Sequence, residues 1–456
     1  MPDDMNPTAI SGVIPRLAVK AHHQPRSETG IGALMPWADR LWFVTYVAHK
    51  SPSGGGTGLF SIDDDLVISK HPKSVVGTYA NRLVHKETSQ LFIGPHVIDV
   101  DGAVATIDAL VDIRLTATCR HLTDPANKVY FLGMEGEFLE VDVHTYEVKQ
   151  LADLQLELGV EGYPHFKDAY TRHGRVVVVN NSYFDRDFPT GESDGRLAEW
   201  DGSSWRILAR TQFNTLASAN GIGDALYAVG QDRASALLHV YLPATGWQVY
   251  RLPKSTHTQD HAFTTEWPRI REVESERLLM DASGTFFELP SMTYDNAVWG
   301  LRPIASHLRV VGDFCSWNGL LVMAGDQNTP IADSNPVAGQ PQANLWFGKT
   351  DDLWQWGKPA GWGGPWWDTE VEAGTSSDPY LMTGYDGKCL HLSHDAQSPV
   401  DFAIEVDFMG NGRWHRYRTV TVDGYDCVTF PPGFSAHWVR LVPSASCRAT
   451  GQFIYT

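Results

Sequence analysis

The sequence predicts an all-β protein, built as a seven-bladed β-propeller with a small C-terminal β-sandwich. Short apolar strands recur at intervals of roughly 40 to 60 residues, which is the spacing of propeller blades. The 456 residues include 41 glycines and are rich in aromatic side chains, with 16 tryptophans, 16 tyrosines and 19 phenylalanines. Long helical patterns are missing. This balance favours an all-β enzyme or a carbohydrate-binding protein.

Seven stretches carry the strand pairs of the predicted blades. In most of them, strands alternate with glycine, aspartate or asparagine turns. In chain order the stretches are ALMPWADRLWFVTYV, NRLVHKETSQLFIG, RHLTDPANKVYFLGMEGEFLEVDV, DAYTRHGRVVVVNNSYF, NGIGDALYAVGQDRASALLHVYL, PRIREVESERLLMDASGTFFEL and LRVVGDFCSWNGLLVMAGD. They place the propeller in residues 1–330.

The pattern changes after Gly325. Residues 331–374 include NLWFGKTDDLWQWGKPAGWGGPWWD, which is too aromatic for a flexible linker, so we expect packed irregular structure that connects the two domains. Alternation returns in YLMTGYDGKCLHLSH and VDFAIEVDFMGNGRWHRYRTVTV, and predicts a β-sandwich over residues 375–456.

Charge and composition exclude several classes of partner. The chain has 36 basic and 54 acidic side chains, a formal charge of −18, which opposes binding to nucleic acid or to anionic membranes. No apolar run of about 20 residues is present, and Met1 to Gln24 lacks the apolar core of a secretory signal, so we expect a soluble chain. The five cysteines form no CxxC pair, and indicate neither a disulfide framework nor a structural zinc site.

In a propeller, residues at the starts of the innermost strands converge although they are distant in sequence. A histidine at such a position can act as an acid or a base, and arginine or lysine can neutralise a carboxylate, so together they predict a site for an acidic sugar. The candidates are Arg82, His85, Arg120, His121, His165, Lys167, Arg269, Arg271 and Asp313.

Two alternatives stay open for the histidines. Any one of them is more often a surface residue or a satisfied core residue than a catalyst. Alternatively, His85, His121 and His165 bind one transition-metal ion in the propeller channel, because three imidazoles suit such an ion, although no HxxxH spacing supports this.

The stretch LWFVTYVAHKSPSGGGTGLFSID contains a glycine run. A phosphate-binding P-loop has its lysine and hydroxyl after the last glycine, followed by a helix, and neither is present here. The pattern instead predicts strand, turn and strand, and it places His49 where the hairpin opens.

Several motifs resemble one enzyme family over nearly the whole chain. They are RHLTDPANKVYFLGMEGEFLEVDV, YRLPKSTHTQDHAFTTEWPRIRE, LRVVGDFCSW, LWFGKTDDLWQWGKPAGWGGPWW and SDPYLMTGYDGKCLHLSH. They are similar to motifs of seven-bladed propeller enzymes that remove terminal L-rhamnose from D-glucuronate in arabinogalactan side chains. Members are described both as α-L-rhamnosidases and as L-rhamnose-α-1,4-D-glucuronate lyases. This substrate class implies a periplasmic or secreted protein.

The resemblance also implies roles for individual residues. In some members a single histidine near the first-blade hairpin carries the activity, and the matching position is His49. Related lyases use histidine and arginine from the inner strands, which ranks His85 second. Substrate-binding roles then fall to Arg82, His121, His165, Lys167 and Arg271. No cofactor is required, and the metal-ion alternative stays open.

Three functions are compatible with these residues. A lyase needs a base for the C5 proton of glucuronate and a cation beside the carboxylate. A hydrolase usually needs two carboxyl groups, either about 5 Å or roughly 6.5 to 9.5 Å apart. A non-catalytic sugar-binding propeller needs neither. The candidates are rich in histidines and cations, which favours elimination.

Overall fold

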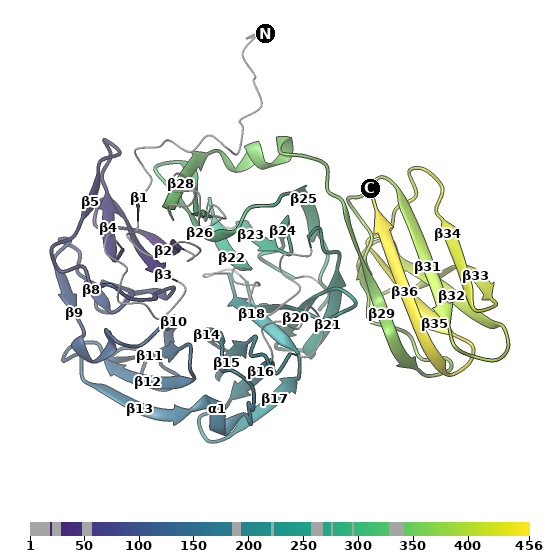
Figure 1. Ribbon diagram of the computed structural model, residues 1–456, viewed down its shortest axis with the longest axis horizontal. Coiled ribbons are helices and arrows are strands. Elements are labelled where there is room, and N and C mark those ends of the chain that lie inside the picture. The colour runs from purple at the N-terminus through teal and green to yellow at the C-terminus, as the bar shows by residue number, and fades with distance from the viewer. Residues whose placement is uncertain are drawn as a thin grey trace, which may run out of the picture. The chain divides into compact units, whose positions relative to one another are not determined.

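The computed structural model describes residues 19–20, 29–47, 57–184, 193–219, 223–256, 268–274, 277–293, 296–327 and 342–456 (Figure 1). Strands make up most of this part of the chain. The helices within it are short, namely η2 (Asp108–Leu110), α1 (Leu154–Glu157) and η3 (Thr350–Gln355). None of the described helices is long and apolar enough to cross a membrane.

The chain folds as two compact units. The first contains the described residues of Met1–Asp185, Glu192–Leu216 and Arg309–Asp352. The second contains those of Ala217–Leu308 and Leu353–Thr456. Each unit is built of antiparallel sheets whose strands mostly follow one another along the chain.

The described part of the first unit holds five four-stranded sheets. Their strands are β2 (Thr29–Trp37), β3 (Arg40–Val47), β4 (Leu59–Ile62) and β5 (Ile68–Lys70); β6 (Arg82–His85), β7 (Gln90–Ile93), β8 (His96–Ile98) and β9 (Val104–Thr106); β10 (Leu115–Arg120), β11 (Lys128–Gly133), β12 (Glu137–Asp142) and β13 (Val148–Asp153); β14 (Phe166–Arg172), β15 (Arg175–Asn180), β16 (Arg196–Trp200) and β17 (Trp205–Ala209); and β26 (Val311–Trp317), β27 (Leu320–Gln327), β28 (Gln342–Gly348) and β1 (Val19–Lys20).

The N-terminal strand completes the last of these sheets. β1 pairs antiparallel with β28, with Val19 opposite Ala343. A two-residue strand from the N-terminal part of the chain therefore forms the outer edge of a sheet whose other strands come from the end of the same unit, and a very short edge strand offers little surface for pairing with other chains.

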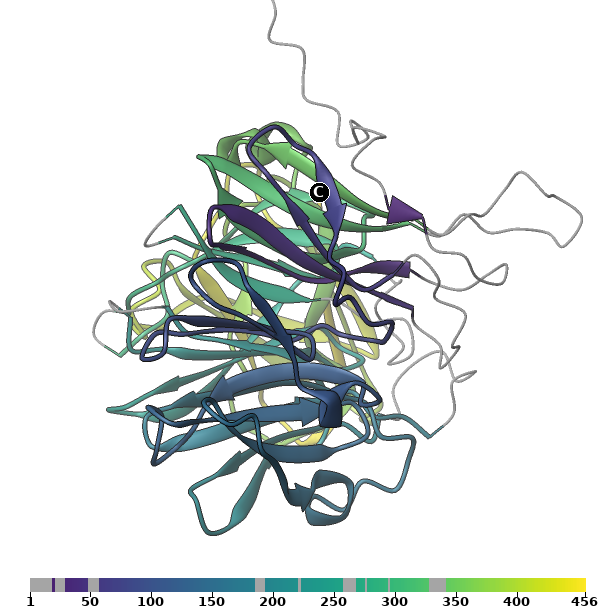
Figure 2. The same cartoon turned by 90° about the vertical axis from the view of Figure 1, so that its left-hand side faces the viewer.

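The first strands of neighbouring sheets lie against one another. β2 contacts β26 and β6, and β10 contacts β6 and β14 (Figures 1 and 2). Tyr79, just before β6, forms a parallel bridge with Leu115 at the start of β10. These two strands therefore run in the same direction, so residues at their starts lie at one end of the sheets and residues at their ends lie at the other.

Four of these first strands are irregular near their starts. The pairing register shifts between Ile31 and Ala33 in β2, between Leu115 and Ala117 in β10, between Phe166 and Asp168 in β14, and between Val311 and Phe314 in β26. A bulge leaves an extra residue outside the alternation and re-aims side chains. In β14 the extra residue is Lys167.

The second unit continues the same pattern and then adds the sandwich. One sheet contains β18 (Gln212–Ala217), whose residues up to Leu216 belong to the first unit, followed by β19 (Leu226–Gln231), β20 (Ala236–Leu242) and β21 (Gly246–Leu252) of the second unit. The next sheet contains β22 (Arg269–Val273), β23 (Arg277–Ala282), β24 (Thr285–Leu289) and β25 (Arg302–Ser306).

The sandwich has two layers. One is formed by β29 (Gly361–Val371), β36 (Cys447–Tyr455), β31 (Lys388–His394) and β34 (Tyr425–Thr429). The other is formed by β30 (Tyr380–Leu381), β35 (Trp438–Pro443), β32 (Val400–Asp407) and β33 (His415–Val422). β30 also pairs in parallel with β21, with Tyr380 opposite Arg251, so this layer is continuous with the sheet of β18 to β21.

Apolar cores explain why these sheets form. Val176–Val179 of β15 are fully buried. Successive residues of a strand point to opposite faces, so both faces of β15 are covered by other parts of the protein. A strand buried on both faces is a continuous apolar run in the sequence. In the sandwich, alternate residues such as Leu390 and Leu392 point into a core that also contains Phe402 and Phe453. The predicted all-β class, a propeller with a C-terminal β-sandwich, is confirmed, and the number of seven blades stays a prediction.

The structure differs from the expected irregular segment over residues 331–374. β28 lies in this range and belongs to the last sheet of the first unit, and β29 is the first strand of the sandwich. β29 is Gly361–Val371, with the sequence GWGGPWWDTEV, in which glycine, proline and tryptophan hide the two-residue alternation that identifies other strands. The sandwich thus begins before residue 375.

Candidate functional site

The predicted site residues divide between the two ends of the first strands. Arg82 is the first residue of β6, and His165 directly precedes β14. His85, by contrast, is the last residue of β6, and His121 follows the last residue of β10. At about 3.3 Å per residue, a six-residue strand such as β10 separates its two ends by roughly 20 Å.

This division overturns the metal alternative for His85, His121 and His165. The structure describes all three residues, and their ring nitrogens do not form a group close enough to bind one ion. All three histidines are predicted at strand starts from the sequence. A short run such as NRLVHKE does not define the first and last residues of its strand, so the sequence does not show whether a histidine lies at the start or at the end of the strand.

His49 was predicted as the catalytic residue from the family resemblance. It lies outside the described residues, as does most of the glycine run after it. Its role stays a prediction.

Arg82 forms an ion pair with a buried aspartate of another sheet. Its Nε lies 3.1 Å from Oδ2 of Asp313, which is fully buried, and its Nη1 donates to the carbonyl of Leu34 at 2.5 Å. The same Asp313 oxygen accepts the backbone N–H of Leu34 at 2.9 Å. Arg82 and Asp313 therefore connect β6, β2 and β26, and the guanidinium is already balanced by a carboxylate.

His85 is buried and uses both ring nitrogens within its own surroundings. Nε2 lies 2.8 Å from the carbonyl of Pro125, and Nδ1 lies 2.7 Å from Oγ1 of Thr88. The backbone N–H of Thr88 also donates to Nδ1 at 3.3 Å. His85 is therefore a buried histidine whose ring nitrogens are both satisfied, as in the alternative of a satisfied core residue.

His121 is similarly engaged. Its Nε2 lies 2.9 Å from Oε2 of Glu140, whose other oxygen accepts from Nζ of Lys128 at 2.7 Å. Its Nδ1 accepts the backbone N–H of Asp124 at 2.9 Å. His121 therefore belongs to a charged network at the opposite end of the strands from His165.

His165 and Lys167 lie together where β14 begins. The backbone N–H of Phe166 donates to the carbonyl of Met134 at 2.9 Å, which holds the start of β14 against the turn between β11 and β12. Gly136 in that turn has φ of 106°, and an added Cβ would lie 3.1 Å from the ring of Phe166, so the close approach requires glycine.

The end of β15 and the residues after it complete this group. The N–H of His165 donates to Oγ of Ser182 at 3.0 Å, and the N–H of Asn181 donates to the carbonyl of His165 at 3.1 Å. Asn180 is opposite Phe166 in the β14–β15 register. The name His165 cluster is used below for His165, Lys167, Asn180, Asn181 and Tyr183.

Two buried polar atoms of the His165 cluster have no hydrogen-bond partner among the described residues. They are Nδ1 of His165 and Nδ2 of Asn180. Buried polar groups are nearly always paired, so such atoms at one place point to a missing polar partner such as a ligand or a water molecule. His165 directly precedes β14 and Asn180 ends β15, the strand paired with it, so both atoms lie where this pair of strands meets, close in sequence or register to the buried Lys167.

The charge state of His165 follows from its surroundings. Burial lowers the pKa of His165 well below its usual value, and the positive charges of Lys167 and Arg114 lower it further, whereas a side-chain hydrogen bond with Asn181 acts in the opposite direction. The imidazole is therefore neutral at neutral pH, which is the form that can accept a proton.

Two tyrosines extend the His165 cluster towards solvent. The rings of Tyr183 and His165 are 6.0 Å apart and nearly perpendicular. The ring of Tyr163 lies 5.5 Å from that of Tyr183, and the residue Tyr163 is 63% exposed. Aromatic faces of this kind can pack against a sugar ring, and a phenol can donate a proton. Sequence analysis missed both tyrosines, although they occur in the short segments EGYPHF and NNSYF.

The second unit contains a histidine–aspartate pair that sequence analysis also missed. Nε2 of His307 lies 3.0 Å from Oδ1 of Asp281, and both side chains are almost fully buried. The ring of His307 stacks on Phe286 at 4.4 Å. Of the predicted arginines, Arg269 is opposite Asp281 in the β22–β23 register, and Arg271 donates from Nη1 to the carbonyl of Ile270 at 3.0 Å.

Comparisons with known proteins give a similarity in structure alone. No family model and no curated protein matches the chain. The β-propeller domain of Myceliophteria thermophila Cps50 (Swd1) is 12% identical, with a TM-score of 0.39 over 72% of this chain and 97% of that one. Luciferin-regenerating enzyme is 9% identical, with a TM-score of 0.36 over 74% and 96%.

A solved oligogalacturonate lyase in complex with manganese is 11% identical to the chain, with a TM-score of 0.38 over 74% of this chain and 92% of that one. At these identities and TM-scores, neither the activities of the three proteins nor their ligands are carried over to this chain.

Proposed function

We propose that the chain is a carbohydrate-active enzyme that cleaves terminal L-rhamnose from D-glucuronate in arabinogalactan-type glycans by β-elimination. The resemblance of its motifs to rhamnose–glucuronate lyases and rhamnosidases supports the substrate. The observation that carries the reaction type is the buried, neutral His165 beside the ammonium group of Lys167.

Elimination requires a base that lies close to a cation. A base removes the C5 proton of glucuronate, and the electron pair forms the C4–C5 double bond while the bond from C4 to the rhamnosyl oxygen breaks. The leaving oxygen takes up a proton, so the products are L-rhamnose and an unsaturated uronate. A cation beside the carboxylate stabilises the enolate charge that develops after proton removal.

The groups of the His165 cluster match these needs. In the tautomer that carries its proton on Nε2, the unpartnered Nδ1 of His165 is the basic atom, and Lys167 supplies a positive charge two residues away. Tyr183 supplies a phenol near the imidazole for the leaving oxygen. Arg82 is less suited to the substrate carboxylate, because Asp313 already balances its charge.

Two carboxylates near the cluster, Asp194 and Asp168, are engaged with protein groups, which supports elimination over hydrolysis. Asp194 accepts the N–H groups of Glu161 and Gly162 at 2.6 and 2.8 Å and pairs with Arg196 at 2.7 Å. Asp168 accepts from Thr215 and from the N–H of Leu216 at 3.0 and 2.8 Å. Both carboxylates thus hold protein groups in place, whereas a glycosidase needs two that face the substrate.

The resemblance and the geometry point to different histidines as the base. The resemblance favours His49, and the described geometry favours His165. His85 is less suited, because both its ring nitrogens are engaged with the protein. The substrate class also leads us to propose an acidic glycan as the partner and a periplasmic or secreted location.

A single assay tests the proposal. The full chain is incubated with a rhamnose-capped glucuronate oligosaccharide, and released rhamnose is measured together with short-wavelength ultraviolet absorbance. Equal amounts of rhamnose and of an absorbing unsaturated uronate are expected. Rhamnose without absorbance would show an α-L-rhamnosidase, and binding without release would show a sugar-binding propeller. Either result would overturn the proposed elimination.

A further inference from the structure

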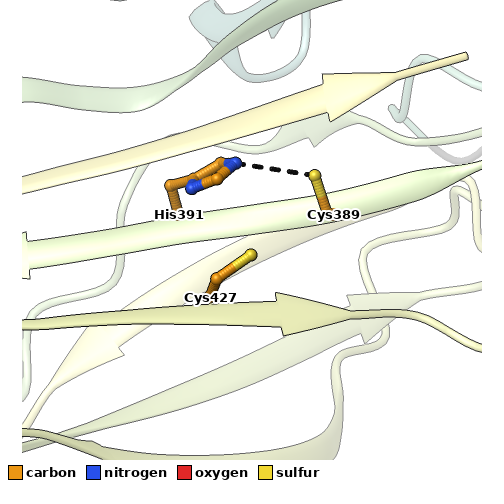
Figure 3. A group of neighbouring side chains, drawn as sticks. All are labelled: Cys389, His391 and Cys427. Atoms are coloured by element: carbon orange, nitrogen blue, oxygen red, sulfur yellow. Dashed lines mark hydrogen bonds between the residues drawn. The ribbon is translucent and has the colours of Figure 1, made fainter.

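A group of soft metal-ligating side chains lies on the sandwich, in the second unit. In the part of the chain that the structure describes, one group of three such side chains has ligand atoms that all lie within 4.8 Å of one another, and its members are Cys389, His391 and Cys427. Sγ of Cys389 is 3.6 Å from Nε2 of His391 (Figure 3). The sequence contains no CxxC pair, so ligand spacing along the chain did not reveal this group.

Strand pairing explains why the three side chains converge. Cys389 and His391 are alternate residues of β31 and therefore point to the same face of the sheet. His391 is directly opposite Cys427 of the neighbouring strand β34. Residues 389 and 427, which are far apart in sequence, become neighbours through this register.

The convergence is not a consequence of core packing. Leu390, Leu392 and Val428, which alternate with the three residues, are the ones that point into the sandwich core. Cys427 is exposed, and Cys389 is partly exposed, whereas the remaining cysteines, Cys119, Cys315 and Cys447, are buried. A cysteine is usually buried as a small apolar residue, so two thiols on the outer face of one sheet need another explanation.

A tyrosine on the same face orients the imidazole. The hydroxyl of Tyr425 lies 3.0 Å from Nδ1 of His391, which leaves Nε2 on the side of Cys389. Histidine ligands of metal ions commonly use their second nitrogen in this way, because a partner there sets the tautomer and the ring orientation. Tyr425 is therefore an independent second sign of a ligand site.

The separation of the Cys389 and His391 ligand atoms suits a tetrahedral ion. A thiolate at about 2.3 Å and an imidazole nitrogen at about 2.0 to 2.1 Å from one tetrahedral ion are about 3.5 Å apart. The observed distance between Sγ of Cys389 and Nε2 of His391 is 3.6 Å. Two thiolates and one imidazole prefer soft or borderline cations over calcium or magnesium.

We propose that Cys389, His391 and Cys427 bind one thiophilic cation of the zinc class, with a fourth position left for a water molecule or another ligand. The site crosslinks β34, the edge strand of its sheet, to β31. It does not depend on the proposed lyase activity, because its residues belong to the sandwich and not to the His165 cluster.

The main competing explanation is a disulfide between the two cysteines. Cys389 is opposite Thr429 and Cys427 is opposite His391, so the two cysteines are a diagonal pair. The two Sγ atoms lie within 4.8 Å of each other, but diagonal pairs are typically roughly 7 to 8 Å apart along the backbone, which is longer than the usual Cα separation of a disulfide. A disulfide would also leave the Tyr425–His391 contact without a purpose.

The test uses the full chain, purified without a polyhistidine tag, treated with a chelator and kept reduced under nitrogen. Cobalt(II) is titrated as a spectroscopic probe, followed by zinc. One equivalent of cobalt should bind and give thiolate charge-transfer absorption with the intense visible bands of tetrahedral cobalt. One equivalent of zinc should abolish these bands, and mass spectrometry under native conditions should show one zinc per chain.

Matched variants identify the ligands. Cys427→Ser and His391→Ala should each weaken cobalt binding by about 100-fold or more, and Tyr425→Phe by about 10- to 100-fold, the range for loss of a partner of a ligand. His415→Ala changes an exposed histidine of the other layer and should bind cobalt like the unchanged chain. Circular dichroism of each variant checks that the sandwich is folded.

Three results would overturn the proposal. The first is the absence of thiolate–cobalt absorption from a folded, reduced chain. The second is unchanged binding by both Cys427→Ser and His391→Ala, which would place the ion elsewhere. The third is a Cys389–Cys427 disulfide in peptide mapping that forms under air even when zinc is in excess.

Discussion

Arg82 and Asp313 are 231 positions apart in the sequence, and their side chains form an ion pair of 3.1 Å between β6 and β26. Asp313 is fully buried and also accepts the N–H of Leu34 in β2. The pair therefore links three neighbouring strands of the first unit through one carboxylate.

Asp313→Ala should be strongly destabilising for this reason. Removing one partner of a buried ion pair leaves the other charge uncompensated, which costs about 3 to 5 kcal/mol. The free energy of unfolding of the first unit, measured with urea, should fall by that amount. Arg82→Met should cost at least as much, because it leaves the fully buried carboxylate of Asp313 without its cation, whereas Asp313→Ala leaves the partly exposed Arg82. A loss below about 0.5 kcal/mol for Asp313→Ala would show that the pair does not stabilise the fold.

His49→Gln and His165→Gln distinguish the two candidate bases. Glutamine keeps a polar side chain but cannot accept a proton at neutral pH, so the variant at the true base should lose most turnover while its melting temperature changes little. His144→Gln is the control, because His144 is an exposed turn residue after β12. If both variants stay fully active and His85→Gln is inactive, the reaction takes place at the opposite strand ends.

Lys167→Met tests the electrostatic part of the His165 cluster. The positive charge of Lys167 contributes to the lowered pKa of His165, so its removal should raise that pKa. In the unchanged chain kcat/KM should stay high well below pH 6.5, because His165 remains neutral there, and in Lys167→Met the acid-side loss should begin at higher pH.

Turnover of Lys167→Met on the uronate substrate should also fall, by about 2 to 4 kcal/mol of transition-state stabilisation. Arg82→Met and Arg271→Met are comparison variants for the other two predicted carboxylate partners. A methyl ester of the uronate should be much less affected than the free acid by loss of the true partner. Equal losses on both substrates would indicate damage to the fold.

Buried histidines should make the protein sensitive to acid. Burial lowers the pKa of His96 and of His239 from 6.5 to about 4. Between pH 6.5 and about 4, the unfolded chain therefore binds protons that the folded chain does not, so the free energy of unfolding falls as the pH falls. Each histidine contributes at most about 3 kcal/mol to this loss. The contribution of these two histidines to the free energy of unfolding is fully present above pH 6.5.

His96→Gln isolates the contribution of one residue. His96 is fully buried, and a neutral glutamine cannot take up the proton, so the slope of unfolding free energy against pH should become shallower in the first unit. The exposed His144→Gln should leave the slope unchanged. A slope in His96→Gln equal to that of the unchanged chain would contradict the assignment.

Periodicity and turn residues were sufficient to predict most of the strands. The stretch KVYFLGMEGEFLEVD, for example, forms β11 and β12 around a glycine turn, as expected. The alternation failed in β29, where packing of tryptophan and glycine residues determines the strand. The seven-blade count depends on how sheets are arranged in space, and sequence repeats indicate this only indirectly.

Less of the candidate site could be predicted. His165 and Lys167 were identified as a pair, but the bulge that places Lys167 and the unpartnered amide of Asn180 depend on register between β14 and β15. The sequence pattern does not show that His85 lies at the end of its strand and His165 before the start of its strand, because both are histidines next to a short apolar run. The thiol and imidazole group of the sandwich likewise arises from register alone.

The parallel pairing of β21 with β30 limits how this protein can be divided. Arg251 of β21 reinforces the junction, with ion pairs of 2.7 Å to Asp232 and 2.8 Å to Asp378. A chain shortened to residues 1–374 would leave β21 with an open edge and Arg251 without one of its acidic partners. Open strand edges pair with strands of other chains, so such a chain should self-associate. The C-terminal layer that contains β30 therefore keeps the protein soluble by covering the edge of β21.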